Sequence, residues 1–310
     1  MCYDWPMKMI LMGTGTSHGV PVIGCACSVC RSPDPRDTRF RCSAYIASPA
    51  RIVIDTGPEF RLQAIRHGIT GLDAVLLTHS HADHLHGLDD IRIFSHTKSS
   101  DANPANPRSL ETEGKGIPVY ANPACLRDVR YRFDYVFKDV QLGGGKPKLD
   151  LEDNSVFRPG SPLVIQGLEI LPVPLLHGRL DDSGYLLTET RARDGRRHSI
   201  AYLTDLSSIP DESVKLIMEN ACNGGTLEHL VVDAIRIKPH STHFCFNDAL
   251  ALADRLQARH TWFIHLTHDL SHEQVEAFIA ASLRNYPALL RIVGEGGSVA
   301  PAYDGLVLEA

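Results

Sequence analysis

The feature that most constrains this chain is an H-S-H-A-D-H segment that directly follows an apolar, strand-like run. Side chains alternate between the two faces of an extended segment, so His79 and His81 point the same way. If the chain then turns into a helix, Asp83 and His84 face the same cavity from its first turn. The spacing therefore predicts two bundles of metal ligands on either side of a shared water, and disfavours a histidine-rich surface loop. Imidazole and carboxylate groups together suit zinc, manganese or iron.

Four further residues close apolar strands elsewhere in the chain and are candidate partners of this segment. His177 ends a strand and is followed by glycine and another strand, which makes it a candidate ligand. Asp205 closes the run I-A-Y-L-T and could bridge two metals, and His265 closes W-F-I and completes a metal bundle. Asp55 ends the run R-I-V-I, where its carboxylate could hydrogen-bond neighbouring loops or orient a metal-bound histidine.

Cysteine usage points to a second kind of metal site. Three of the eight cysteines, Cys25, Cys27 and Cys30, form a C-x-C-x-x-C pattern. Three thiols can wrap one tetrahedral zinc, but the zinc then needs a fourth ligand from elsewhere, and His268 is our choice for it. The alternative is three free cysteines in a reducing cytosol. We expect a small zinc-binding loop at about residues 24–31.

Two histidines in the segment K-P-H-S-T-H-F precede a predicted helix and are candidates for substrate contact. His243 is carried forward as a catalytic candidate, whereas a solvent-exposed loop position is the favoured interpretation for His240. His86 is expected not to be a ligand, and the sequence assigns no role to His18 or His272.

Hydrophobic periodicity predicts one α/β domain over residues 1–310, in which strands end in His or Asp and alternate with helices. Strands are expected at residues 8–12, 43–47, 51–54, 72–77, 117–120, 168–174, 183–188, 200–205, 230–234, 261–264 and 290–293, and helices at 60–67, 85–92, 125–137, 211–220, 247–256 and 273–286. The polar residues 96–116, rich in Ser, Asn and Pro, are expected to be a surface insertion.

The glycine loop G-T-G-T-S-H-G after the first strand does not indicate a dinucleotide-binding turn. Its spacing is G-x-G-x-x-x-G, and Pro21 stands where the phosphate-binding helix would begin. The simpler interpretation is a turn whose glycines let the backbone lie close to the metal cavity.

Charge and hydropathy limit the partners. The net charge of −6 gives no basic footprint for a large nucleic acid, which speaks mildly against such a partner. No apolar run reaches the roughly 20 residues that a membrane span needs, and the N-terminus lacks a charged region followed by an apolar core. We therefore expect a cytoplasmic protein that binds no membrane.

The strand-end residues together resemble the signature of the metallo-β-lactamase superfamily. Five motifs fall at Asp55, at residues 79–84, at His177, at Asp205 and at His265, and none is missing. The resemblance covers residues 8 to about 305. It implies an αββα sandwich, with two mixed β-sheets face to face and helices on the outer faces, and it implies a working metal-dependent hydrolase.

The motif G-T-G-x-x-x-G-V-P, the cysteine pattern and the closing I-H-L-T-H resemble the PhnP family, cyclic phosphodiesterases of the carbon–phosphorus lyase pathway. The resemblance implies two divalent active-site metals, manganese or zinc, and one structural zinc, and by analogy a homodimer. By that likeness, His79, His81 and His177 hold one metal, Asp83, His84 and His265 hold the second, Asp205 bridges them, and Cys25, Cys27, Cys30 and His268 hold the structural zinc.

The implied reaction is hydrolysis of small phosphodiesters, including cyclic ones, by a metal-bridged hydroxide. Asp83 would orient the hydroxide and His243 would assist the leaving group. Three alternatives stay open: an RNase Z-like nuclease that processes tRNA, a lactonase- or thioesterase-type hydrolase, and a non-hydrolytic protein like PqqB. The chain shows no arm for gripping tRNA, the second alternative leaves the cysteine pattern unexplained, and the intact H-x-H-x-D-H disfavours the third.

Overall fold

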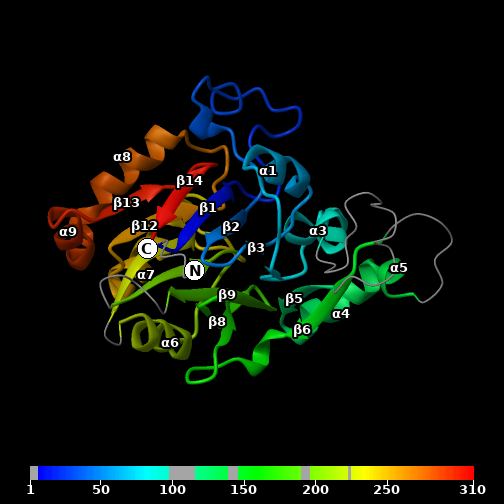
Figure 1. Cartoon of the computed structure of the whole chain (residues 1–310). Coiled ribbons are helices and arrows are strands. Elements are labelled where there is room, and N and C mark those ends of the chain that lie inside the picture. The colour runs from blue at the N-terminus through cyan, green and yellow to red at the C-terminus, as the bar shows by residue number, and fades with distance from the viewer. Residues whose placement is uncertain (1–5, 98–115, 139–145, 190–195, 223–224) are drawn as a thin grey trace.

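The computed structural model describes residues 6–97, 116–138, 146–189, 196–222 and 225–310. Two seven-stranded mixed β-sheets face each other, and helices cover their outer faces (Figure 1). This four-layer arrangement confirms the αββα sandwich that the sequence predicts.

The two sheets share one pattern of strand pairing. The first has the order β14 (Leu306–Glu309), β1 (Lys8–Gly13), β2 (Ser43–Ser48), β3 (Ile52–Ile54), β4 (Ala74–Leu76), β5 (Ile117–Ala121), β6 (Leu149–Asp153). The second has the order β13 (Ser298–Pro301), β12 (His260–Ile264), β11 (Gly225–Asp233), β10 (Arg197–Leu203), β9 (Leu180–Glu189), β8 (Leu168–His177), β7 (Leu163–Ile165). Strands β14 to β3 and β7 to β10 pair antiparallel, whereas β3 to β6 and β10 to β13 pair parallel. Strands β3 and β10 therefore occupy equivalent places, where each sheet changes from antiparallel to parallel pairing.

The helices form two outer layers. One layer consists of α1 (Phe60–Arg66), α2 (Ala82–Leu85), α3 (Arg92–Thr97), α4 (Pro123–Arg132) and α5 (Asp134–Phe137), and the other of α6 (Asp211–Cys222), α7 (Phe246–Leu256), α8 (His272–Ser282) and α9 (Pro287–Gly294). Figure 1 shows α6 to α9 on one side of the sheets and α1, α3, α4 and α5 on the other. Among the described residues, no helix is long and apolar enough to span a membrane.

Alternation of side chains along each strand fills three buried apolar clusters among the described residues. In β10, Ile200 and Tyr202 point into the cluster between the sheets, whereas Ala201 and Leu203 pack under the helices on the outside. The first sheet is covered in the same way by α1, α3 and α4. Strands buried on both faces read as nearly continuous apolar runs, which is why the sequence located most of them.

One predicted strand is wrong. Residues 290–293 form part of α9 and are not extended. Pro287 stands in the first turn, where its fixed φ favours a helix start, and Leu289 and Ile292, three residues apart, are buried on one face. The run of apolar residues is too short for periodicity alone to separate a strand from a buried helix.

Other boundaries moved by smaller amounts. The helix expected at 125–137 is two helices, α4 and α5, because the backbone leaves helical geometry at Phe133. The helix expected at 85–92 is interrupted after α2 and resumes as a 3₁₀ turn and α3. Strands β6, β13 and β14 were not predicted, and most of the expected insertion, residues 98–115, lies outside the described residues.

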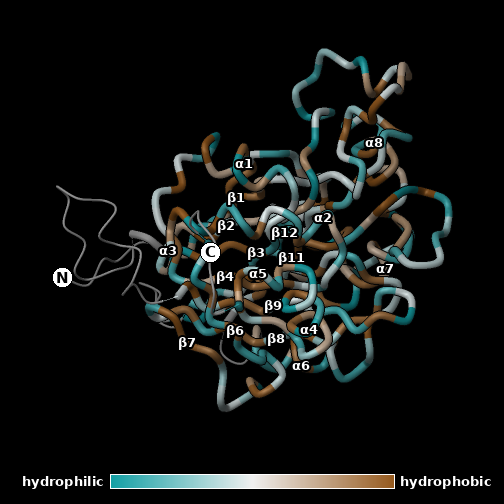
Figure 2. The backbone as a smooth tube through the Cα atoms, turned by 90° about the vertical axis from the view of Figure 1, so that its right-hand side faces the viewer, coloured by the Kyte–Doolittle hydropathy of each residue, from teal (hydrophilic) through white to brown (hydrophobic). Residues whose placement is uncertain are grey.

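Polar residues gather where the parallel strands end. Figure 2 shows brown, apolar segments mainly along the central strands and teal segments mainly in the connections around them. The connection between β1 and β2 (residues 14–42) projects beside α8 in both views (Figures 1 and 2), and Arg36 pairs there with Glu276 at 3.6 Å. The carboxyl ends of β3, β4, β10 and β12 lie within three residues of predicted site residues, which is where α/β sheets place their sites.

Candidate active site

The fold brings all seven predicted ligands of the dinuclear site into two adjoining sets. The first set is His79, His81 and His177, and the second is Asp83, His84, Asp205 and His265; within each set the potential ligand atoms lie within 4.8 Å of one another. His79 and His81 follow β4, Asp83 and His84 lie on α2, and His177 ends β8. The two remaining members follow β10 and β12. Their role as metal ligands stays a prediction, but their convergence is observed.

Asp205 lies between the two sets. Its Oδ2 is 3.1 Å from His84 Nε2 and its Oδ1 is 3.2 Å from His265 Nε2. It also forms a group with His177 and His243 in which the ligand atoms lie within 4.8 Å of one another. Both of these carboxylate–imidazole distances are to the second set, and the group with His177 brings Asp205 next to the first set, as a bridging ligand requires.

The donor atoms fit divalent cations. His79 Nε2 is buried and has no hydrogen-bond partner, and the buried His84 Nε2 and His265 Nε2 face carboxylate oxygens at 3.1–3.3 Å without hydrogen-bond geometry. A buried imidazole nitrogen without a partner is costly, by about 1–3 kcal/mol, and such exceptions need a reason. Nitrogen and carboxylate donors aimed at one space are the donors that zinc, manganese and iron take in proteins.

The electrostatics agree with this fit. Burial lowers the pKa of most of the site's imidazoles, which keeps their lone pairs free: His79, His81, His177 and His265, the last to about 4. For His84, three carboxylates raise the pKa against the effect of burial, Asp205 most strongly. The same concentration of negative charge attracts a divalent cation.

Strained backbone holds three of these side chains over the edge of the sheets. Asp55, Asp205 and His265 have φ values of 60°, 54° and 60° in the left-handed region. This conformation costs non-glycine residues about 1–2 kcal/mol each, and such strain tends to cluster at functional sites. Asp55 and His265 directly follow β3 and β12, and Asp205 lies two residues after β10, so the sharp turn places each side chain at a strand end.

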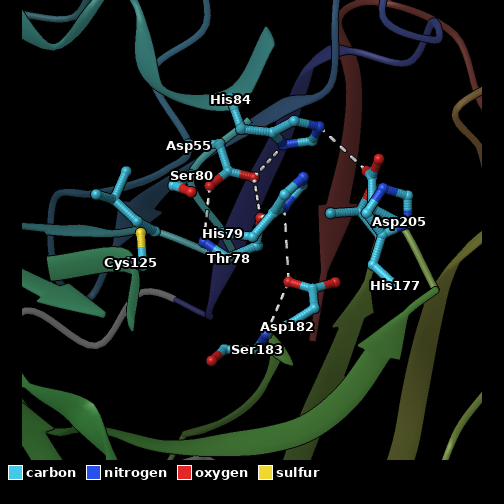
Figure 3. A network of polar contacts seen from close by, with 12 residues as sticks. Asp55, Thr78, His79, Ser80, His84, Cys125, His177, Asp182, Ser183 and Asp205 are labelled. Carbon is cyan, nitrogen blue, oxygen red and sulfur yellow. Dashed lines mark hydrogen bonds and ion pairs between the residues drawn. The ribbon is translucent and has the colours of Figure 1, made fainter. Parts of the chain in front are cut away.

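Asp55 connects the histidines of both sets, as Figure 3 shows. Its Oδ1 accepts a hydrogen bond from the Thr78 backbone N–H at 2.8 Å, and its Oδ2 accepts from Thr78 Oγ1 at 2.9 Å. His84 Nδ1 lies 2.7 Å from the same Oδ2, and His79 Nδ1 lies 3.0 Å from Thr78 Oγ1. One buried carboxylate therefore orients His84 directly and His79 through Thr78. This geometry agrees with the orienting role predicted for Asp55.

Two further buried carboxylates at the site were missed by the sequence reasoning. Asp182 Oδ1 lies 3.6 Å from His79 Nδ1 and accepts the Ser183 backbone N–H at 2.7 Å (Figure 3). Asp233 Oδ2 lies 2.8 Å from His243 Nδ1. Asp233 ends β11, so the strand-end pattern that singled out Asp55 could have found it. Asp182 lies inside β9 and carries no local signal.

His243 lies against the ligand sets. Its ring stacks on His265 with centroids 4.5 Å apart and an interplanar angle of 16°, and it lies 4.7 Å from the His177 ring. Burial lowers its pKa, and the nearby Asp205 opposes that shift. Its Nδ1 faces Asp233, which leaves Nε2 as the nitrogen available to a substrate.

The predicted cysteine site also assembles. The Sγ atoms of Cys25, Cys27 and Cys30 each lie 3.4 Å from His268 Nδ1. A tetrahedral zinc with ordinary Zn–S and Zn–N bonds separates sulfur from nitrogen by about 3.5 Å, so the spacing fits. The backbone N–H of Cys30, followed by His268, lowers the pKa of Cys27 to about 6, which favours the thiolate that zinc binds.

The cysteine group ties the β1–β2 connection to the end of β12. Thr16 N donates to Leu266 O at 3.2 Å, and Leu266 N donates to Thr14 O at 3.1 Å, directly after His265. A zinc held by this group would therefore restrain the segment that positions one member of the dinuclear site.

The remaining histidines separate by burial. His18 and His86 are exposed and belong to neither set. His272 is buried; its Nδ1 accepts from Arg39 Nη2 at 3.2 Å and its backbone N–H donates to Asp37 at 2.6 Å. It joins α8 to the β1–β2 connection and belongs to none of the candidate ligand groups among the described residues.

Comparison with known proteins decides the family. Residues 50–266 match the family model described as "Beta-lactamase superfamily domain". A crystal structure described as that of a new diphosphatase from the PhnP family shares 35% identity and a TM-score of 0.72, with 98% of each chain covered. The chain belongs to the PhnP family of the metallo-β-lactamase superfamily. The members of this superfamily are mostly hydrolases, and its fold implies that this PhnP-family protein binds divalent metal ions.

Two curated relatives carry other names. An octanoyltransferase of Porphyromonas gingivalis is 34% identical over 296 residues, which is 94% of this chain but 52% of that protein. A ribonuclease Z of Mycobacterium marinum is 34% identical over 105 residues, 33% of this chain and 38% of that protein. The PhnP-family chain thus spans about half, or less, of the length of these relatives.

Proposed function

We propose that this protein is a metal-dependent phosphodiesterase that acts on small phosphodiesters, including cyclic ones. The observation that carries the proposal is the convergence of seven ligand-type side chains, Asp205 among them, with His243 and its carboxylate partner beside them. Family membership supports hydrolysis, and the name of the neighbour from the PhnP family supports a phosphorus centre as the site of attack.

Two divalent cations held by the two sets would lower the pKa of a shared water towards neutrality and neutralise charge on the phosphoryl oxygens. The protein's own residues perform the remaining tasks. The neighbouring His84 holds the pKa of Asp83 well below its usual range despite burial, so Asp83 stays an acceptor that can orient the attacking water. Its Oδ2 lies 3.3 Å from His84 Nε2.

His243 is placed to protonate the leaving oxygen. Asp233 accepts the Nδ1–H bond, which fixes the ring and stabilises the imidazolium form that must donate from Nε2. Because His243 acts in its protonated form, this contribution to the rate decreases as the pH rises through its pKa. In this His243–Asp233 pair, Asp233 positions the histidine, a role that the sequence did not predict.

A second candidate reaction is cleavage of a diphosphate bond, which the neighbour's name favours and the same site chemistry permits. The octanoyltransferase name belongs to a protein of which this chain matches about half, so acyl transfer can reside in the other half. Sequence similarity to the ribonuclease Z of Mycobacterium marinum covers a third of the chain, and the net charge of −6 does not favour tRNA.

The test combines metal analysis with a substrate panel. Purified protein should contain two active-site metals and one zinc, and should cleave 2′,3′-cyclic AMP or bis(p-nitrophenyl) phosphate faster than a nucleoside diphosphate, an octanoyl thioester or precursor tRNA. His81→Ala should lower the rate by at least about 100-fold. His86→Ala, at an exposed histidine of the same segment, is the matched control and should stay within about twofold. A fully metal-loaded protein that cleaves no phosphodiester would refute the proposal.

A further inference from the structure

A second imidazole lies beside the site without a part in the proposed reaction. The ring centroid of His240 is 5.1 Å from that of His243, whose ring in turn contacts His177 and His265. His240 therefore lies on the outer side of His243, further from the two ligand sets. Its loop, residues 234–245 between β11 and α7, contains Arg236 and Lys238 but no acidic residue, in a chain of net charge −6.

The hydrogen bonds of His240 fix which nitrogen carries its proton. The Thr242 backbone N–H lies 3.3 Å from His240 Nδ1, and Thr242 Oγ1 lies 3.2 Å from the same atom. A backbone N–H can only donate, so Nδ1 must be the acceptor and the neutral ring carries its proton on Nε2. Burial, and then His243 and Arg236, lower the pKa of His240, which favours this neutral form.

His243 has the opposite tautomer. Its Nδ1 faces Asp233 Oδ2 at 2.8 Å, and the same oxygen accepts the Leu206 backbone N–H at 3.1 Å. An ionised carboxylate has no proton to donate, so with Asp233 in its carboxylate form Nδ1 of His243 carries the proton. The two adjacent imidazoles thus have different tautomers. His243 Nε2 can accept and donate a proton, whereas His240 Nε2–H is a hydrogen-bond donor in the neutral ring.

The loop that presents His240 is held against the first ligand set. Thr242 O lies 2.7 Å from His177 Nδ1, so one residue orients His177 through its carbonyl and His240 through its N–H. A Cβ atom added to Gly178 would come within 3.1 Å of Thr242 Cγ2. This close packing holds His240 at a defined distance from the ligand sets. A residue that discriminates between substrates needs such a fixed position.

We propose that His240 is a specificity-determining residue whose Nε2–H binds an acceptor oxygen on the leaving group, next to the oxygen that His243 protonates. The proposal rests on the proposed phosphodiesterase function and adds a preference to it. Leaving alcohols that carry further hydroxyl or ether oxygens gain this hydrogen bond, and aryl alcohols without an oxygen in that position do not.

The test compares two phosphodiesters on the zinc-loaded full-length chain. His240→Ala should lower kcat/KM for 2′,3′-cyclic AMP by about 10–50-fold, mainly through KM, and should change that for bis(p-nitrophenyl) phosphate by less than about twofold. His240→Gln keeps an N–H donor near the position of Nε2 and should restore most of the loss. His86→Ala is the control for replacing a histidine near the site.

A spectroscopic readout tests the tautomers independently of activity. Two-bond ¹H–¹⁵N correlation spectra of the zinc-loaded protein should show the Nε2–H form for His240 and the Nδ1–H form for His243. If the wild type is active, three results would overturn the role of His240 alone. These are an Nδ1–H form at His240, equal losses of kcat/KM on both substrates in His240→Ala, or no loss on either substrate in that variant. A wild type that cleaves neither phosphodiester would instead refute the proposed function, and this role with it.

Discussion

The chain of hydrogen bonds through Thr78 makes a specific prediction about the metal sites. Thr78 is fully buried, and its hydroxyl both donates to Asp55 and accepts from His79. Thr78→Val keeps the shape of the side chain and the backbone hydrogen bond to Asp55 Oδ1, but it removes the hydroxyl. The histidine then loses its partner at 3.0 Å and retains Asp182 at 3.6 Å.

The expected size follows from the lost contacts. A buried donor left unpaired costs about 1–3 kcal/mol, and a hydrogen bond to a charged group contributes about 1.5–3 kcal/mol. Because Asp182 can move to take the Nδ1 proton, we expect the free energy of unfolding of the metal-free protein to decrease by about 2–4 kcal/mol. Loss of an orienting partner typically lowers metal affinity by about 10–100-fold. The set that contains His79 should be affected more than the set that contains His84.

The measurement is a zinc titration in competition with a chromophoric chelator, together with urea unfolding of the metal-free protein. Thr78→Ser is the matched control, because it keeps the hydroxyl and loses only a methyl group, at a cost of about 1 kcal/mol. If Thr78→Val bound zinc with the affinity of the wild type, or if Thr78→Ser lost as much affinity as Thr78→Val, the hydrogen-bond argument would be refuted.

Three further predictions follow from other parts of the structure. Cys30→Ser should remove one zinc equivalent by elemental analysis and lower the free energy of unfolding in zinc-containing buffer by about 3–4 kcal/mol; unchanged zinc content would contradict the site. Asp233→Asn should lower kcat by about 10²–10⁴-fold with little change in KM, and an unchanged kcat would exclude the dyad. His272 is buried with a pKa lowered from 6.5 to about 4, chiefly by burial, so the fold favours its neutral form. The free energy of unfolding should therefore decrease by about 2–3 kcal/mol as the pH falls from 6.5 towards 4, because the unfolded chain takes up the proton more readily. In urea unfolding at several pH values, His272→Asn should show a correspondingly smaller decrease.

The sequence alone was enough to predict which candidate ligands converge, because their signals are local. The H-x-H-x-D-H spacing, the C-x-C-x-x-C pattern and the acids or histidines that end apolar strands each lie within a few residues, and their chemistry does not depend on the rest of the chain. Apolar runs buried on both faces likewise predicted most of the strands, and the resemblance to the metallo-β-lactamase superfamily implied the αββα sandwich. The same kind of signal failed at residues 290–293, where a short apolar run fits a helix as well as a strand.

Tertiary structure alone decided which groups hold these ligands in place. Asp182 reaches His79, 103 residues away, because the Ser183 N–H bonds to Thr78 O at 3.1 Å and so joins the second sheet to the end of β4. The positions of Asp233 beside His243 and of Thr242 between His177 and His240 depend equally on how distant strands and loops pack. Such contacts arise from the pairing of strands far apart in the chain, and no periodicity or spacing in one segment encodes them.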